Sequence, residues 1–190
     1  SANGSPEDQS IRVAEHAIIH AMIQIGATEP LFESLKLARE PRRTRAALVA
    51  LDQLSPKAFA ATDVLPFLSA TSPLVQRTAG WIAARRPDWG PALTGYFESR
   101  LGQPPKSPAE VARLEGQLKD LARSPAIQGV LAKAVTTGTE AAVISLRAMA
   151  TAGLKEIPGA WLEAITSALP SGATPVRRQA VATTRALTLP

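Results

Sequence analysis

A short pattern recurs along the chain: a proline, an arginine a few positions later, and a small residue two positions after the arginine. It occurs in residues 41–51, 72–83 and 174–187, where the arginines are Arg45, Arg77 and Arg178. A motif that returns at wide, near-regular spacing indicates a repeat array. Such arrays present extended surfaces rather than closed catalytic pockets, so this feature constrains the fold more than the function.

Apolar residues with a 3.6-residue period, separated by short breaks of Pro, Gly, Ser or Thr, predict a chain of helices. We expect helices at residues 10–25, 29–39, 41–54, 62–69, 73–86, 89–101, 108–123, 125–136, 139–152, 158–169 and 174–188. Equivalent positions in the second helix of each pair are 31 to 35 residues apart, at Arg45, Arg77, Ala112, Val143 and Arg178. Two helices of about 12 residues with two turns fill that period.

The expected boundaries have chemical support. Prolines suit the first helical turn and fall at Pro41, Pro73, Pro108 and Pro175. Candidate N-caps are Ser72, Ser107 and Thr174, and candidate left-handed C-caps are Gly26, Gly138 and Gly153. Apolar spacing predicts that core-facing stripes run through Ala47/Leu48/Leu51, Ala79/Ile82/Ala83 and Ala180/Val181/Thr184.

Composition excludes several classes of protein. The chain of 190 residues is 45% hydrophobic and 4% aromatic, which suits packed helices and a continuous core. It has no cysteine, so disulfides, thiolate metal sites and cysteine nucleophiles are excluded. No apolar run is long enough to span a membrane, and no signal peptide is visible. The net charge of +5 is compatible with an acidic partner or nucleic acid, and is also ordinary for an arginine-preferring bacterial chain.

These paired helices, with proline near a helix start and arginine in the second helix, resemble the HEAT-repeat family over residues 10–188. The likeness is strong for the second helices at 41–54, 73–86 and 174–188 and weak over 108–152. It implies an armadillo-like, right-handed α-solenoid that serves as a scaffold and binds partners, with the second helices lining its concave surface. We expect an all-α chain of about five antiparallel helix pairs plus a leading helix over residues 10–190, with residues 1–9 a disordered or expression-derived N-terminus.

A narrower resemblance rests on RVAEHAIIHAMIQI, PRRTRAALVALDQL and SPLVQRTAGWIAARRPDWGPALTGYFESRL, in residues 12–25, 41–54 and 72–101. These segments resemble the HEAT part of large exported planctomycete-type proteins that combine a membrane-bound-dehydrogenase-like propeller with a c-type haem domain. The resemblance implies a periplasmic or exported location and a spacer or docking role, with activity residing in other domains. The chain would then be a fragment of a longer protein, in contact with a protein partner or with neighbouring domains of its parent.

Two constellations could carry chemistry. His16 and His20 share a helical face, but Ala17 stands where a zinc-protease motif needs Glu, and no third ligand is evident, so we expect no metal. The arginines Arg39, Arg42, Arg43, Arg85 and Arg86 suit an acidic partner or phosphates. Arg45, Arg77 and Arg178 are expected instead to pair between repeats.

The three tryptophans are the largest apolar anchors. We expect Trp81 and Trp161 to pack in the core, and Trp89 to be the exception that contacts a partner beside the arginines. No phosphate loop, nucleophile elbow or polarised acid pair is present in the sequence, so no enzyme activity and no cofactor are expected. The predicted function is a monomeric, non-catalytic protein–protein interaction module, and the alternative is a basic HEAT-like nucleic-acid binder.

Overall fold

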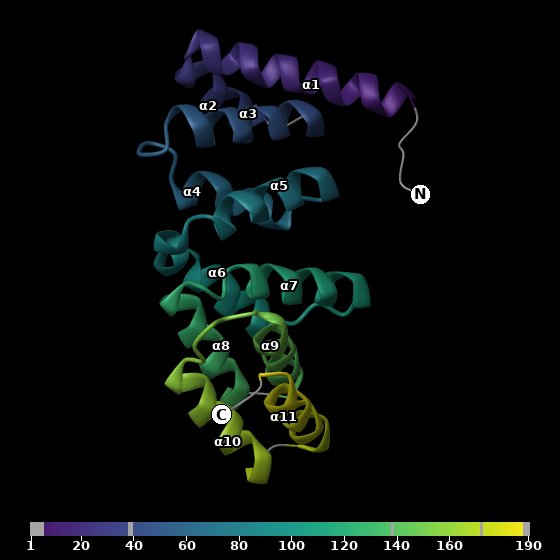
Figure 1. The fold of residues 1–190 in the computed structure, drawn as a ribbon, viewed down its shortest axis with the longest axis vertical. Coiled ribbons are helices and arrows are strands. Elements are labelled where there is room, and N and C mark those ends of the chain that lie inside the picture. The colour runs from purple at the N-terminus through teal and green to yellow at the C-terminus, as the bar shows by residue number, and fades with distance from the viewer. Residues whose placement is uncertain (1–5, 38–39, 138, 172, 188–190) are drawn as a thin grey trace. The chain divides into compact units, whose positions relative to one another are not determined.

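The computed structural model describes residues 6–37, 40–137, 139–171 and 173–187 (Figure 1). Regular secondary structure in these residues is entirely helical, with no strand. The elements are α1 (Pro6–Ile25), α2 (Thr28–Leu37), α3 (Pro41–Leu54), α4 (Ala61–Val64), η1 (Leu65–Ser69), α5 (Pro73–Ala84), η2 (Pro87–Trp89), α6 (Gly90–Gly102), α7 (Pro108–Asp120), α8 (Pro125–Thr137), α9 (Thr139–Thr151), α10 (Gly159–Ser171) and α11 (Thr174–Ala186). The all-α prediction is therefore confirmed, and α1 begins at Pro6 rather than at residue 10.

The chain divides into two compact units, residues 1–82 and residues 83–190. The boundary falls within α5. Unit 1 contains α1 to α4, η1 and most of α5, and unit 2 contains η2 and α6 to α11.

Helix starts follow the prolines. Pro41, Pro73 and Pro108 are the first residues of α3, α5 and α7, as predicted. At α3 the cap is a residue that the sequence did not single out: the carboxylate of Glu40 accepts hydrogen bonds from the backbone N–H groups of Arg42 at 2.9 Å and Arg43 at 2.7 Å. A carboxylate there satisfies two free donors and complements the helix dipole.

Two of the predicted caps differ in detail. Ser107 is the N-cap of α7, but its side chain makes no capping hydrogen bond. Thr174 is the first helical residue of α11, and the cap position belongs to Ala173, so the Thr174 prediction was one residue out. Pro175 accounts for the shift, because a proline is equally well accommodated at the second helical position, where its missing N–H also costs nothing.

Glycine ends two helices as predicted. Gly26, after α1, has φ of 67°, and Gly153, after α9, has φ of 61°. This left-handed conformation strains residues with a Cβ atom, so glycine is the favoured residue at both ends. The third predicted position, Gly138, lies outside the described residues.

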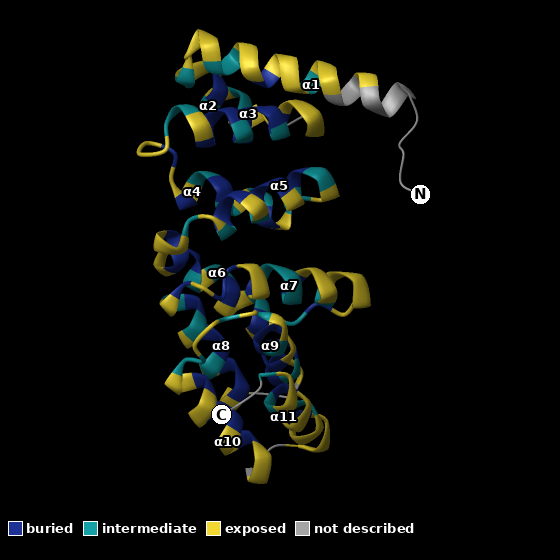
Figure 2. Ribbon diagram, in the orientation of Figure 1, coloured by how far each residue is buried: buried dark blue, intermediate teal, exposed yellow. Residues whose placement is uncertain are grey.

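The core of unit 1 forms around α3. Both α1 and α2 pack against α3, and Leu48 and Leu51 on α3 are fully buried (Figures 1 and 2). Leu31 and Leu35 of α2 are also buried. Among the described residues of α1, only Ile19 is buried. The predicted stripe Ala47/Leu48/Leu51 is therefore confirmed, whereas most of the described surface of α1 faces away from the core.

Unit 2 is built from two rows of helices. One row contains α6, α8 and α10, with α8 packed against both others; the second contains α7, α9 and α11, with α9 packed against both others (Figure 1). The rows are joined where α8 packs on α9 and α10 packs on α11. Both rows contribute fully buried side chains, and the largest is Trp161 of α10. The central helices α8 and α9 therefore pack against helices of both rows.

Polar contacts within unit 2 join residues about one period apart. Trp161 donates its indole N–H to the carbonyl of Gln128, 33 residues earlier, at 3.1 Å. The hydroxyl of Thr183, which is fully buried, donates to the carbonyl of Leu146 at 2.9 Å. Both contacts tie a helix to the preceding member of its own row.

The apolar stripe of α11 was predicted wrongly. Val176, Ala180 and Thr183 are buried, whereas Val181 is 41% exposed and Thr184 is intermediate. Only Ala180 is shared with the predicted set. An error of one residue in helical phase turns a side chain by about 100°, which is enough to exchange a buried position for an exposed one.

Candidate functional site

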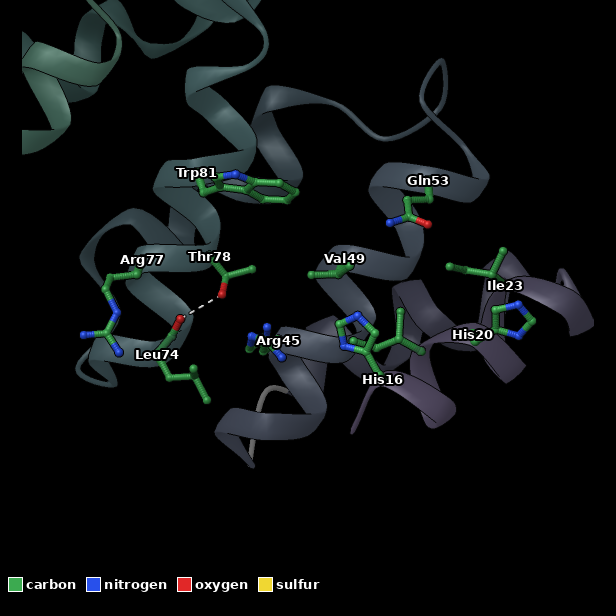
Figure 3. Close-up of a pocket in the computed structure, with 11 residues that line it drawn as sticks. His16, His20, Ile23, Arg45, Val49, Gln53, Leu74, Arg77, Thr78 and Trp81 are labelled. Carbon is green, nitrogen blue, oxygen red and sulfur yellow. Dashed lines mark hydrogen bonds between the residues drawn. The ribbon is translucent and has the colours of Figure 1, made fainter. Parts of the chain in front are cut away.

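Unit 1 contains a groove of about 560 Å³ between α1, α3 and α5 (Figure 3). We call it the α1–α3–α5 groove. Its lining residues are His16, Ile19, His20 and Ile23 from α1, Arg45, Val49 and Gln53 from α3, and Leu74, Arg77, Thr78 and Trp81 from α5. Ligand sites in proteins have volumes of roughly 300–1,000 Å³, so the groove is large enough to hold a few side chains.

Trp81 provides the largest apolar surface in the groove. Its side chain is 49% exposed, whereas Trp89 is 8% exposed and Trp161 is fully buried. In Figure 3 its indole projects from α5 toward the side of the groove on which α3 carries Val49. A half-exposed indole beside arginine is the type of residue that dominates binding energy at protein interfaces. The prediction that Trp89 is the exposed tryptophan and Trp81 a core residue was therefore wrong.

The position of Trp81 follows from helix geometry. Thr78, Ala79, Ile82 and Ala83 are the buried residues around it, and they define the inner face of α5. Trp81 comes two residues after Ala79, so it lies about 200° around the helix from Ala79. The position of Trp81 opposite the apolar stripe could be read from the sequence. The prediction of a buried Trp81 instead followed the usual preference of tryptophan for the interior.

Arg45 is held by an ion pair within unit 1. Its Nη1 atom lies 2.5 Å from Oε1 of Glu15 on α1, and the two side chains are 28% and 18% exposed. The contact is an ion pair and not a hydrogen bond. This ion pair supports the prediction that Arg45 pairs with an acid on a neighbouring helix. The negative charge of Glu15 is therefore already paired with an arginine of the groove wall.

Arg77 differs from Arg45. Its side chain is exposed, and no ion pair or hydrogen bond joins its guanidinium to another residue in the described part of the chain. The predicted pairing of Arg77 between repeats is therefore not observed among those residues. Gln53 on α3 is also exposed, whereas the hydroxyl of Thr78 is engaged, because it donates to the carbonyl of Leu74 at 2.9 Å.

His16 and His20 both line the groove and are exposed. They project from successive turns of α1, as their spacing predicted (Figure 3). No cluster of three or more histidine, aspartate or glutamate side chains suited to a metal occurs among the described residues. The two imidazoles add polar groups to the lining of the groove.

Of the predicted partner-binding arginines in unit 1, Arg42 and Arg43 are exposed at the start of α3. Their backbone N–H groups are the ones that Glu40 caps, so a carboxylate lies beside both. Arg39 lies outside the described residues. On α2, Glu33 raises the pKa of the exposed Lys36, mainly through a hydrogen bond and to a smaller extent through charge attraction. Lys36 therefore also has an acidic neighbour.

The remaining predicted site residues belong to unit 2. Arg85 is exposed. Arg86 lies over the ring of Trp89, with its guanidinium carbon 4.8 Å from the ring centroid, a cation–π contact. Trp89 itself is buried at the end of η2. This arrangement gives Arg86 and Trp89 a packing role, and it accounts for the burial of the tryptophan that we had expected to be exposed.

The arrangement in the groove suits non-covalent recognition. Its walls come from three helices of unit 1, and its surface combines an indole, aliphatic side chains, two arginines and two histidines. No helix in the described residues has both the length and the apolar character needed to cross a membrane. No protein-family model matches the sequence, and no curated protein matches it, so the geometry of the groove is the evidence on function.

Proposed function

We propose that the chain is a HEAT-like α-solenoid that acts as an interaction module and does not catalyse a reaction. The two rows of helices in unit 2 and the polar contacts that recur after 32 to 37 residues support this proposal. In the proposed arrangement α1 leads, and five antiparallel pairs follow: α2/α3, α4–η1/α5, η2–α6/α7, α8/α9 and α10/α11. Stacked pairs of this kind present a pre-formed surface, so a partner is bound with little loss of chain entropy.

The single observation that carries the proposal is the exposure of Trp81 in the α1–α3–α5 groove. α3 and α5 are the second helices of their pairs, and in HEAT-like proteins these helices line the binding surface. Burial of a half-exposed tryptophan removes up to about 100 Å² of apolar surface from water, since the whole side chain buries about 150–250 Å². At about 25 cal/mol per Å², this contributes about 2.5 kcal/mol to binding.

The proposal is tested by selecting binders from a random library of 12-residue peptides displayed on phage, with the 190-residue chain as the target. We expect enriched peptides whose affinity falls at least tenfold when the target carries Trp81→Ala. Val181→Ala is the control, because Val181 is an exposed apolar residue of α11 and lies in unit 2. Peptides that bind the Trp81→Ala protein as well as the unchanged chain would contradict the proposal, as would a selection without enrichment.

The alternative function, nucleic-acid binding through Arg39, Arg42, Arg43, Arg85 and Arg86, stays a prediction. It receives less support, since Glu40 lies beside Arg42 and Arg43 and Arg86 is packed on Trp89. A binder of phosphates loses affinity steeply as salt rises, with a slope set by the number of phosphates neutralised. Titration of a 12-nucleotide oligothymidylate at two salt concentrations measures that slope directly.

A further inference from the structure

The charges lining the α1–α3–α5 groove are all positive or neutral. Eleven of the residues that the structure describes line it, and they include Arg45 and Arg77 and no aspartate or glutamate. Glu15 is the acid that reaches this wall, and it is already paired with Arg45. The charge left for a ligand is therefore that of Arg77, which has no acidic partner among the described residues.

Much of the lining of the groove is apolar. Five of the eleven residues are Ile19, Ile23, Val49, Leu74 and Trp81, and Trp81 leaves about half of its side chain open to solvent. In Figure 3 Val49 and Trp81 project from facing helices, α3 and α5, across the upper part of the groove. An occupant that covers this surface must itself carry a bulky apolar group, because a purely ionic ligand would leave the indole exposed.

Gln53 adds a third requirement. Its amide is exposed on α3, and no hydrogen bond to it occurs in the described part of the chain. A primary amide offers both donors and an acceptor, which match the N–H and C=O groups of an extended peptide backbone. Base edges offer similar groups, but one unpaired arginine is a small electrostatic contribution for a nucleic acid, whose affinity comes mainly from several phosphate contacts.

We propose that the α1–α3–α5 groove binds an acidic protein segment in which an aspartate or glutamate lies next to an aromatic or branched aliphatic residue. The carboxylate pairs with Arg77, the apolar side chain packs on Trp81 and Val49, and Gln53 bonds to the peptide backbone. This inference rests on the proposed interaction function and names the chemistry of its partner. Arginine suits the carboxylate because its planar guanidinium can donate two parallel hydrogen bonds.

The test uses three phage libraries of 12-residue peptides on the full 190-residue chain. The first combines Asp and Glu with Phe, Leu and Ile; the second replaces the acids with Lys and Arg; the third keeps the acids and replaces the apolar residues with Ser and Gln. We expect enrichment from the first library alone. The best acidic–apolar peptide is then synthesised, and its Kd is measured by fluorescence anisotropy.

A charge reversal tests the role of Arg77. We expect Arg77→Glu to weaken the acidic–apolar peptide at least tenfold and to strengthen binding of its Lys-substituted counterpart. Arg178→Glu is the matched control, because Arg178 is an exposed arginine at the start of α11 and lies outside the groove; it should change Kd by less than twofold. Circular dichroism of both variants establishes that the helices are intact.

The outcomes separate the two proposals. Peptides that require Trp81 but show no excess of Asp and Glu, or that bind Arg77→Glu unchanged, overturn the acidic partner and leave the interaction module standing. If none of the libraries yields a peptide whose affinity falls with Trp81→Ala, both proposals are overturned. Tight binding of oligothymidylate that Arg77→Glu abolishes, without binding of acidic peptides, overturns the inference in favour of nucleic acid.

Discussion

Arg147 on α9 reaches Glu115 on α7, the previous helix of the same row, with its Nη1 atom 3.2 Å from the carboxylate Oε1. The Nε atom of the same guanidinium lies 3.4 Å from Oε1 of Gln179 on α11. Glu115 and Gln179 are each 32 residues from Arg147. One arginine therefore connects all three helices of the row, at the spacing that first indicated a repeat.

The Arg147–Glu115 pair should contribute little to stability despite its central position. The two side chains are 51% and 22% exposed, and exposed ion pairs contribute about 0.2–1 kcal/mol because water screens them. A double-mutant cycle with Arg147→Met and Glu115→Gln, followed by urea unfolding, measures the coupling free energy. The coupling should fall further in 1 M salt. A coupling free energy above about 2 kcal/mol would show that the pair behaves as a buried one.

Arg147 also shows what the sequence could and could not reveal. The first residues of α3, α5, α7, α8, α9 and α11 were predicted correctly, and four of these helices begin with a proline, whose chemistry is local. Alignment by helix starts, however, directed attention to Val143 of α9 instead of Arg147. Whether a charged residue finds a partner depends on the approach of another helix, which spacing along one chain does not define.

The tryptophans illustrate the same division. Trp161 was predicted to be buried, and it is fully buried. Its indole N–H, which needs an acceptor in the interior, donates to the carbonyl of Gln128. Trp81 and Trp89 were exchanged. Trp89 lies in a short 3-10 segment, where no apolar period exists to indicate which face is buried, and Arg86 covers its ring. The groove residues as a group could not be predicted, since they come from three helices that only packing brings together.

Trp161→Phe should destabilise the protein by about 1–3 kcal/mol. The change leaves a gap in a fully buried site and removes the hydrogen bond of 3.1 Å to Gln128 that ties α10 to α8. Urea unfolding followed by circular dichroism measures the loss. Trp81→Phe is the comparison, and it should lie within about 0.5 kcal/mol of the unchanged protein because Trp81 is half exposed. Equal losses for both variants would contradict the difference in burial.

Thr183→Val tests the buried hydroxyl of α11. The shape of the side chain is kept, but the hydroxyl that donates to the carbonyl of Leu146 at 2.9 Å, and accepts a longer bond of 3.5 Å from Nε2 of Gln179, is removed. Thr183 is fully buried, so we expect a loss of about 0.5–1.5 kcal/mol in the free energy of unfolding. Thr184→Val is the matched control, because the hydroxyl of Thr184 bonds only within its own helix, to Ala180. A larger effect at Thr184 than at Thr183 would argue against a stabilising contact between α11 and α9.

Gly90→Ala tests a close approach between two segments of unit 2. A Cβ atom on Gly90 at the start of α6 would lie 1.8 Å from Oγ and 2.8 Å from Cβ of Ser124, so one of the two segments has to move. Overpacking of this kind costs about 1–3 kcal/mol.

Ser124 is 1% exposed, and its hydroxyl has no hydrogen-bond partner among the described residues. Ser124→Gly should therefore recover most of the stability lost by Gly90→Ala, because it removes both atoms in conflict. Ser124→Ala should recover much less, since it keeps the Cβ atom. Urea unfolding of the four proteins gives the comparison, and equal recovery by glycine and alanine would show that the conflict lies with the hydroxyl alone.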